Sequence, residues 1–453
     1  MALSESAHGM WSSRLMFILA AAGSAVGLGN IWRFPYVVGD NGGGAFVIVY
    51  LLCIFLVGIP IMSSEILLGR LGRQSPINTM KTVASSSGAS PGWQIIGWMG
   101  AFVGFMILSF YAVIGGWIIA YVFKLGSGDF SGMDSGFSGS TFADFTGNVW
   151  SVVGWHSLFL IITIFITARG VSRGLETAVK YLMPALFVML AVLVIYAATT
   201  SGHFVQGLSF MFSLDFESLS WNSVLLAMGQ AFFTLSLGMG AIMAYGAYMP
   251  KDTSIIGTAT TVALLDTTVA LMSGLVIFPL VFANGLEISQ GPGLMFVTLP
   301  VAFGQMAGGQ LFGCVFFILV TVAAITSAIS LVEPVVAWIV EKLKTTRVNS
   351  ALILGGAAWL LGLGSAFSTN IWADVHIFAE MTYLDTMDYV SNNLLLPLGG
   401  ILIAVFSGWV LDKKMRDSEM INDSAYYPVW QVLTRFVAPL AVFTVFILTF
   451  VTA

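Results

Sequence analysis

The amino-acid sequence predicts an all-α polytopic membrane protein with about eleven spans, and three observations support that fold class. Of its 453 residues, 58% are hydrophobic and only 9% are charged, whereas about a quarter of the residues of a soluble domain are charged. Eleven apolar segments approach or exceed the roughly 20 residues that cross a bilayer core. Two of these segments, the first and the sixth, are interrupted by closely spaced glycines. One transmembrane domain over residues 1–453 is expected.

Hydropathy places the segments in order along the chain. They lie near residues 11–38, 42–69, 94–124, 151–169, 177–199, 222–248, 254–283, 309–341, 349–367, 377–411 and 428–452. The connection 125–150 is rich in Gly, Ser, Phe and Asp, which is typical of an irregular loop. The connection 284–308 is apolar enough either to dip into the protein as a lid or re-entrant hairpin or to lie on its surface.

The distribution of basic residues predicts the orientation in the membrane, because cytoplasmic connections carry an excess of Lys and Arg. Alternate connections hold Arg70, Arg73, Lys81, Arg169, Arg173, Lys180, Lys251, Lys342, Lys344, Arg347, Lys413, Lys414 and Arg416. The opposite side holds little more than Arg33 and Lys124, and its loops are acidic. We therefore expect a multi-pass protein of the plasma membrane with a cytoplasmic N-terminus and an external C-terminus.

The first apolar segment contains the run from Gly23 to Pro35, GSAVGLGNIWRFP. Glycine costs about 1 kcal/mol and proline about 3 kcal/mol relative to alanine inside a helix, and a charge such as that of Arg33 is expensive within a bilayer. Non-helical backbone at membrane depth is tolerated only where it lines a cavity or is buried in protein. This run therefore predicts a helix break that forms a binding site.

The sixth segment repeats the pattern between Gln230 and Gly240, QAFFTLSLGMG. Paired breaks in corresponding spans are typical of transporters built from two inverted halves. We therefore expect a first repeat over 11–200, an inverted second repeat over 221–411 and an additional helix over 428–452. The alternative is that Gly238 and Gly240 are helix-packing glycines, which are common in membranes.

These motifs resemble the neurotransmitter:sodium symporter family. Its first-helix signature is similar to Gly23–Pro35 followed by NGGGAF at 41–46, and its second helix resembles Gly58-Ile59-Pro60 with Glu65, Gly69 and Arg70. The sixth and eighth helices of the family resemble Gln230–Gly240 and the pair Thr326-Ser327. Among members, the chain is most similar to the bacterial eleven-span transporters of multiple hydrophobic amino acids. The resemblance implies the inverted five-plus-five fold, sodium coupling and alternating access.

The resemblance also implies two sodium sites. The first would use the Ala25 carbonyl, the Asn30 side chain, Thr234 and Asp266; the second would use the carbonyls of Gly23, Val26 and Ala323 with the hydroxyls of Thr326 and Ser327. The alternative for the two hydroxyls is ordinary bonding back to their own helix.

Asp266 departs from the family pattern, which usually has Asn at that position. Chloride-dependent members bind an anion nearby, and many bacterial members carry an acidic residue one turn later, where this chain has Ala270. We expect Asp266 both to bind sodium and to replace chloride as the local negative charge, so that no chloride is required. The sequence leaves open whether Asp266 also takes up a proton in the return step. Glu65 is expected to bond near the broken helix, and Glu333 is expected to cap free backbone amides.

The substrate is expected between the two breaks, where half-helix N-termini favour a carboxylate. Family members that carry amines have Asp at the position of Gly27, so a chain with glycine there favours a substrate with its own carboxylate. By resemblance the contact residues are Ala25, Gly27, Gly29, Ile107, Tyr111, Phe233, Thr234, Ser236, Met239, Ser327 and Leu331. None of them is charged, which favours aliphatic and aromatic L-amino acids, with Trp among the candidates. The alternative is that the aromatic and Met side chains simply pack in the core.

The resemblance implies two gates. Arg33 and Asp388 would form an outer gate, with Tyr111 and Phe233 as a thinner lid. Trp11, Tyr248 and Glu341 would form an inner gate, although His8 stands where the family has arginine and Arg14 is the available substitute. In the fifth span, Gly174 and Pro184 flank a stretch that either unwinds toward the second sodium site or is only a proline kink.

Other classes fit the sequence less well. The four histidines lie near span ends or in loops, and no metalloprotease, CxxC or nucleophile-elbow motif is present, so an enzyme is not expected. A channel would predict a continuous polar stripe rather than paired breaks. No basic, aromatic-interleaved patch indicates nucleic acid, and Cys53 and Cys314 lie in apolar runs. A sodium-dependent amino-acid sensor without transport remains the alternative to a symporter, and the oligomeric state is not indicated.

Overall fold

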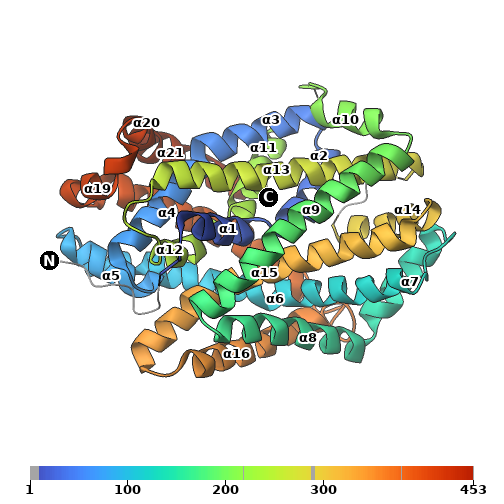
Figure 1. The fold of residues 1–453 in the computed structure, drawn as a ribbon, viewed down its shortest axis with the longest axis horizontal. Coiled ribbons are helices and arrows are strands. Elements are labelled where there is room, and N and C mark those ends of the chain that lie inside the picture. The colour runs from blue at the N-terminus through green and yellow to red at the C-terminus, as the bar shows by residue number, and fades with distance from the viewer. Residues whose placement is uncertain (1–9, 218, 287–290, 379, 452–453) are drawn as a thin grey trace.

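The computed structural model describes residues 10–217, 219–286, 291–378 and 380–451, and throughout these ranges the chain forms helices and their connections, without a strand. Within them, nine helices are long and apolar enough to cross a membrane, and the bent pair Arg14–Ala25 and Gly29–Asp40 raises the number to ten. The longest helices, α6 and α15, lie side by side through the centre of the molecule (Figure 1). The predicted all-α membrane fold is confirmed.

The spans of the first half follow the predicted order. They are α1 (Arg14–Ala25) with η1 (Gly29–Arg33) and α2 (Phe34–Asp40); α3 (Gly44–Cys53) continued by η2 (Ile54–Gly58) and α4 (Ile59–Gly72); α6 (Ile95–Gly126); α8 (Val149–Ala168); and η4 (Val171–Glu176) with α9 (Thr177–Thr200).

The spans of the second half repeat the arrangement, with one more helix at the end. They are α11 (Trp221–Thr234) with α12 (Ala241–Gly246); α13 (Ile255–Ala283); α15 (Gly309–Leu343); α16 (Arg347–Phe367); α17 (Tyr383–Tyr389) with η6 (Val390–Leu395), α18 (Leu396–Val405) and η7 (Phe406–Val410); and α20 (Tyr427–Val432) with η9 (Leu433–Val437) and α21 (Ala438–Val451). Because residues 235–240 separate α11 from α12, neither piece is long enough to count as a span alone, and this accounts for the eleventh predicted segment.

The remaining helices lie in the connections at the two ends of the bundle (Figure 1). They are α5 (Pro76–Ser86), η3 (Pro91–Gln94), α7 (Ser135–Gly147), α10 (Phe204–Phe212), η5 (Leu294–Thr298), α14 (Leu299–Gln305), α19 (Lys413–Glu419) and η8 (Ile421–Asp423). We call the end with α5 and α19 the α5 end, and the end with α7, α10 and α14 the α7 end.

The prediction of an irregular loop over 125–150 is wrong, because α7 occupies half of it. The Asp134 side chain accepts a hydrogen bond from Phe137 N and caps the helix. The rings of Phe142 and Phe145 then pack edge-on against Tyr121 of α6. Tertiary aromatic packing thus outweighs the low helix propensity of the Gly- and Ser-rich segment.

The apolar connection 284–308 enters the protein, which is the first of its two predicted alternatives, and does not lie on the surface. Its helices η5 and α14 bury most of their side chains, among them Met295, Phe296 and Phe303. Ser138 of α7 donates a hydrogen bond to the carbonyl of Val297, which joins the two connections. Glu287, an acidic residue of the predicted outer loop, lies outside the described residues.

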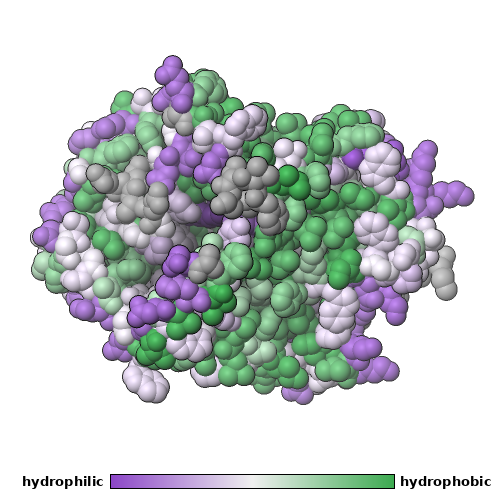
Figure 2. Space-filling view, turned by 180° about the vertical axis from the view of Figure 1, so that it is seen from behind, coloured by the Kyte–Doolittle hydropathy of each residue, from purple (hydrophilic) through white to green (hydrophobic). Residues whose placement is uncertain are grey.

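Burial divides the helices into an inner and an outer set. The helices α6 and α15 are mostly buried, whereas α8, α9 and α21 expose apolar side chains along one face. Figure 2 shows hydrophobic side chains gathered over the middle of one face and many hydrophilic ones toward the two ends. This distribution is typical of a protein with a lipid-facing belt.

A close backbone contact holds α12, the second piece of the broken sixth span, against α4. A Cβ on Gly69 of α4 would lie 2.0 Å from the carbonyl oxygen of Met243 in α12, and a Cβ on Gly246 would lie 2.8 Å from that of Ile66. Small residues at both positions therefore allow the two backbones to touch.

We predict that Gly69→Ala destabilises the protein by about 1–3 kcal/mol, because the added methyl group has no room. Thermal unfolding of the purified protein in detergent measures the loss. Gly154→Ala is the matched control, since a Cβ at Gly154 on α8 meets nothing within 4 Å. Equal stability of the two variants would contradict the packing role of Gly69.

Candidate functional site

The first helix break lies at residues 26–28, where α1 ends at an extended Val26 and η1 begins at Gly29. The two pieces of the helix are bent by 54°. Asn30 Oδ1 accepts a hydrogen bond from Gly27 N (3.0 Å), and Tyr111 Oη accepts one from Leu28 N (3.4 Å). Side chains thus take over backbone groups that the helix no longer pairs, as burial at membrane depth requires.

The second break has left-handed backbone at Ser236 (φ 54°), Gly238 (φ 78°) and Gly240 (φ 73°). Glu65 Oε1 accepts a hydrogen bond from Gly238 N (2.7 Å), which is the bonding role expected of this carboxylate. A Cβ on Gly238 would also lie 2.7 Å from the Leu396 carbonyl oxygen. The glycines therefore both break the helix and pack, and the predicted discontinuous helix is confirmed.

The two breaks are bonded to each other. Ser236 Oγ donates to the Ser24 carbonyl (2.8 Å), and Gln230 Nε2 donates to the Gly29 carbonyl (2.7 Å). Neither bond was anticipated. Their signal in the sequence is the position of two polar side chains inside apolar spans, where each needs a partner.

Asp266 is fully buried in α13 and brings together three of the residues predicted for the first sodium site. Its Oδ1 accepts a hydrogen bond from Asn30 Nδ2 (2.7 Å). The Thr234 hydroxyl lies 3.1 and 3.0 Å from the two carboxylate oxygens. Ala25, the fourth residue, is the last residue of α1 and leads directly into the break.

The residues predicted for the second sodium site also lie together. Ser327 Oγ lies 3.4, 3.1 and 3.1 Å from the carbonyl oxygens of Gly23, Ser24 and Val26. Thr326 Oγ1 bonds back to its own helix at Val322 and Ala323, as the alternative interpretation held. Of these two hydroxyls, that of Ser327 therefore bonds to carbonyl groups of the first span, whereas that of Thr326 bonds within α15.

The donors of both groups suit a small hard cation. Carbonyl, hydroxyl, amide and carboxylate oxygens are the ligands that such ions prefer. Within the described ranges, no three His, Cys, Asp or Glu side chains are grouped as ligands for a metal ion. The single carboxylate, Asp266, favours a monovalent cation over a divalent one.

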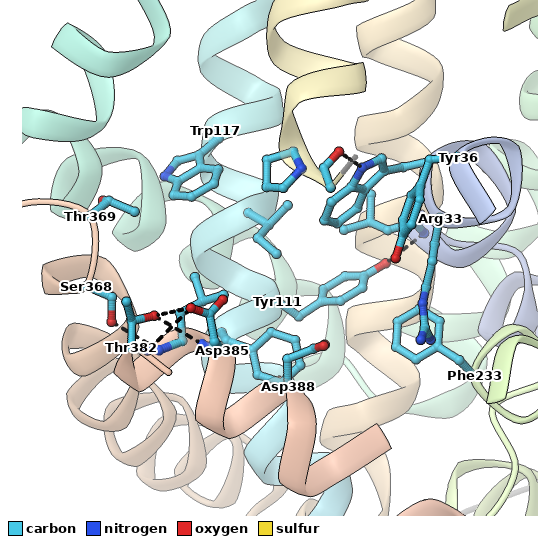
Figure 3. A pocket seen from close by; sticks show the side chains of 17 residues that line it. Arg33, Tyr36, Tyr111, Trp117, Phe233, Ser368, Thr369, Thr382, Asp385 and Asp388 are labelled. Atoms are coloured by element: carbon cyan, nitrogen blue, oxygen red, sulfur yellow. Dashed lines mark hydrogen bonds between the residues drawn. The ribbon is translucent and has the colours of Figure 1, made fainter. Parts of the chain in front are cut away.

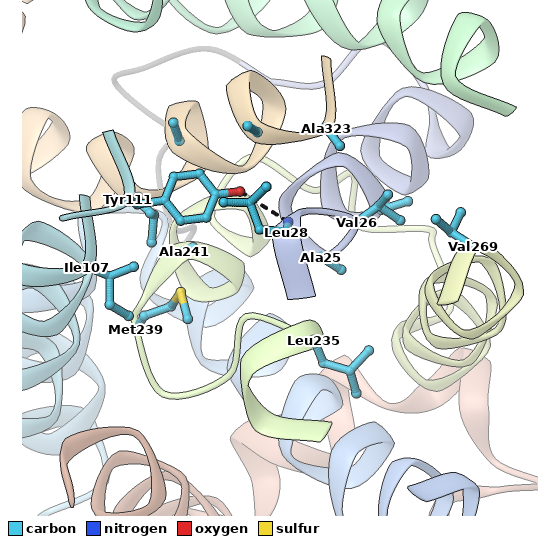
Figure 4. Close-up of a cluster of buried hydrophobic side chains, with 14 of the residues drawn as sticks. Ala25, Val26, Leu28, Ile107, Tyr111, Leu235, Met239, Ala241, Val269 and Ala323 are labelled. Atoms are coloured by element: carbon cyan, nitrogen blue, oxygen red, sulfur yellow. Dashed lines mark hydrogen bonds between the residues drawn. The ribbon is translucent and has the colours of Figure 1, made fainter. Parts of the chain in front are cut away.

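A small cavity of about 20 Å³ lies between the breaks (Figure 4 labels several of its side chains). Every predicted substrate-contact residue lines it except Thr234, which bonds to Asp266 instead. Ser24 and Leu28 also line it and were not predicted, although both belong to the broken segment. The volume accommodates about one water molecule, so a larger occupant requires side chains to move.

A second cavity of about 320 Å³ lies on the α7 side of the first (Figure 3). Leu28, Tyr111 and Phe233 line both cavities and therefore form the wall between them. Arg33 and Asp388 line the larger cavity without forming an ion pair: the Arg33 guanidinium lies 5.3 Å from the centre of the Phe233 ring. The Asp388 carboxylate accepts a hydrogen bond from Asn392 (2.7 Å).

Trp11 closes the α5 side of the site. Its backbone N–H donates to the Tyr248 carbonyl (3.0 Å) and its indole N–H donates to the Tyr245 carbonyl (3.2 Å). Glu341 accepts hydrogen bonds from Ser75 N (2.7 Å) and Asn78 Nδ2 (2.6 Å). The three residues predicted for the inner gate therefore all hold elements together at this end. His8 lies outside the described residues.

The expectation that Glu333 caps backbone amides is wrong. Its carboxylate accepts a hydrogen bond from the Tyr248 hydroxyl (2.8 Å) and forms an ion pair with Arg347. Arg347 also donates to the Thr167 carbonyl (2.9 Å), so it links α15, α16 and α8. A carboxylate inside a span needs a counter-charge, and that requirement was the signal for Arg347. Arg14 is exposed.

The start of the fifth span is helical, with a π-helical turn at η4 that contains Gly174 and with Pro184 inside α9. The Glu176 carboxylate at the end of η4 accepts hydrogen bonds from the backbone and hydroxyl of Ser12. A stretch that could unwind is thus tied to the N-terminal segment. The stretch is wound in this structure, and its unwinding toward the second sodium site stays a prediction.

Comparison with known proteins agrees with this geometry. The model of the sodium:neurotransmitter symporter family matches residues 8–130 and 140–453. The chain is 38% identical to the uncharacterized sodium-dependent transporter YhdH of Bacillus subtilis, over 98% of both chains. It is 25% identical to the sodium- and chloride-dependent GABA transporter 2 of Mus musculus, over 93% of this chain and 76% of that one.

Among solved structures, the crystal structure of MhsT in complex with L-phenylalanine superposes with a TM-score of 0.89. The two sequences are 44% identical, and the match covers 97% of this chain and 99% of that one.

We predict that Glu65→Ala lowers the free energy of unfolding by about 1–3 kcal/mol, because Gly238 N loses its buried acceptor. Glu65→Gln keeps an acceptor oxygen and is expected to lose less. Thermal unfolding in detergent compares the two, with the exposed Glu217→Ala as control. Equal losses for the Ala and Gln variants would refute the role of this hydrogen bond.

Proposed function

The chain belongs to the sodium:neurotransmitter symporter family, and from that membership we propose that it imports hydrophobic L-amino acids together with sodium by alternating access. As a member it is a sodium-dependent transporter and not an enzyme. One observation carries the choice of substrate: the cavity between the two helix breaks is lined entirely by uncharged residues.

The backbone side of this cavity favours a substrate that brings its own carboxylate. A Cβ on Gly27 would lie 2.5 Å from Ser327 Oγ and 3.0 Å from Tyr111 Oη, so no acidic side chain fits there. The half-helix that begins at Gly29 directs its N-terminus, with its partial positive charge, at the site. The Tyr111 hydroxyl adds a donor on the same side.

Much of the remaining wall of the cavity is apolar. Ile107, Phe233, Met239 and Leu331 line it. Methionine is unbranched and flexible and adapts to irregular shapes, so displacement of Met239 can enlarge the cavity for side chains from Val or Leu to Phe or Trp. The similar protein MhsT was crystallised with L-phenylalanine, which supports this substrate class.

Two sodium ions are proposed as co-transported cargo. The first is assigned to the Ala25 carbonyl with Asn30, Thr234 and Asp266, and the second to the carbonyls of Gly23, Val26 and Ala323 with Thr326 and Ser327. Asp266 supplies a fixed negative charge, so we propose that transport needs no chloride.

The orientation is proposed from charge. Arg70, Arg73, Lys413 and Lys414 lie at the α5 end, and basic connections face the cytoplasm. In this orientation the large cavity opens toward the outside of the plasma membrane, where Arg33 and Asp388 are apart. Trp11 and Tyr248 then seal the cytoplasmic side.

Uptake of labelled L-phenylalanine into proteoliposomes tests the proposal. We expect accumulation driven by an inward sodium gradient and none with potassium in its place. Unlabelled L-leucine and L-tryptophan are expected to compete, and failure of the aromatic competitor would refute the broad specificity. Sodium-dependent binding without accumulation would instead indicate the alternative, an amino-acid sensor.

The role of Asp266 is tested by replacing chloride with gluconate. Uptake by the unmodified protein is expected to stay constant, because the carboxylate already supplies the charge. Asp266→Asn removes that charge without changing the shape of the side chain, and we expect at least about a tenfold rise in the sodium concentration for half-maximal uptake, equivalent to about 1.4 kcal/mol. Chloride should partly restore uptake by this variant alone. Loss of uptake by the unmodified protein in gluconate would overturn the assignment.

A further inference from the structure

We propose that a groove between α8 and α16 binds a phospholipid with an anionic head group. The groove has a volume of about 560 Å³ and lies outside the transport site. The two helices run side by side at one edge of the bundle (Figure 1). Leu160 and Ile164 form its buried floor, and the exposed side chains of Ile161, Phe165 and Leu352 form its rims.

Glycine creates the depth of the groove. Gly355 packs so closely that a Cβ there would lie 2.7 Å from Ile164 Cγ1, whereas a Cβ at Gly356 would meet nothing within 4 Å. The open space at Gly356 thus belongs to the groove and not to the contact between the helices. Within a bilayer, such a space is filled by van der Waals packing rather than by exclusion of water.

The length of the groove matches one lipid chain in one leaflet. It extends from Ser157 to Ala168 on α8 and from Val348 to Trp359 on α16. At 1.5 Å per residue either stretch is about 16 Å long, close to half of the roughly 30 Å hydrocarbon core. The Trp359 indole N–H donates to Ser157 Oγ (2.9 Å) and closes the groove at its deep end.

The shallow end of the groove lies at the α5 end of the bundle and is cationic. Arg169 directly follows Ala168, is exposed, and places its guanidinium carbon 4.2 Å from the centre of the Phe165 ring. Two further basic side chains near this end are also exposed: Arg173, which follows Arg169 in the chain, and Lys344, which precedes α16. The acidic side chains on the neighbouring segments already have partners. Glu333 is paired with Arg347, Glu176 accepts hydrogen bonds from Ser12, and Glu341 accepts them from Ser75 and Asn78.

This charge selects the occupant. An anionic phosphate head group at Arg169 complements the cations while its acyl chain fills the groove. A second copy of the chain, docked in the same orientation in the membrane, would bring the same cations to this end. The charge therefore favours an anionic lipid over self-association.

Native mass spectrometry of the full-length protein in detergent, titrated with phosphatidylglycerol or phosphatidylethanolamine, tests the site. We expect the first phosphatidylglycerol to bind roughly fivefold or more tightly than phosphatidylethanolamine, given the contribution of one surface cation. Gly356→Phe fills the groove and should weaken binding of both lipids. Gly154→Phe is its control, an exposed glycine at the α7 end of α8, and should change neither.

Arg169→Gln should abolish the preference for phosphatidylglycerol while leaving binding of phosphatidylethanolamine unchanged. Lys413→Gln is its control, because α19 lies across the bundle from α16 at the same end (Figure 1). Equal affinity of the unmodified protein for the two lipids would overturn the proposal. So would equal effects of the two glycine variants, or a dimer that only Gly356→Phe disrupts.

Discussion

The centre of this protein depends on hydrogen bonds from side chains to backbone that has left its helix. Hydrocarbon offers no partner to a free N–H or carbonyl group, and each unpaired group costs several kcal/mol. Asn30, Tyr111 and Glu65 accept bonds from N–H groups of the two breaks, and Ser236 and Gln230 donate to carbonyls. The same unwinding leaves other carbonyls, among them that of Val26, directed at Ser327. The helix breaks thus have two results: their N–H groups are bonded by side chains, and some of their carbonyl oxygens are left to accept other partners.

Much of this arrangement could be predicted from the sequence. Hydropathy located the spans because a bilayer imposes a minimum apolar length, and clustered glycines located the breaks because glycine is costly inside a helix. The close packing of Asp266 with Asn30 and Thr234 required the family motif, since no spacing rule joins residues so far apart.

Other features could not be predicted, for identifiable physical reasons. Helix α7 depends on aromatic contacts with α6, which a local reading of Gly and Ser does not reveal. Arg33 contacts the Phe233 ring and Asp388 bonds to Asn392 instead of pairing with each other, and no spacing in the sequence sets the distance between side chains on separate helices. Glu333 was assigned to backbone because Pro334 follows it, whereas its partner Arg347 lies on the next helix.

Asp266 has an electrical consequence. Its charge belongs to the chain, so it stays when cargo leaves. With two sodium ions and a zwitterionic amino acid, as proposed, the loaded site carries a net charge of about +1, and the empty site, if ionised, about −1. An inside-negative membrane potential, which acts with about 2.3 kcal/mol per charge for each 100 mV across the full field, then pulls the loaded site inward and pushes the empty site outward. The membrane potential would therefore accelerate both the inward step of the loaded protein and the outward step of the empty protein. With a neutral Asn at this position, only the inward step would be accelerated.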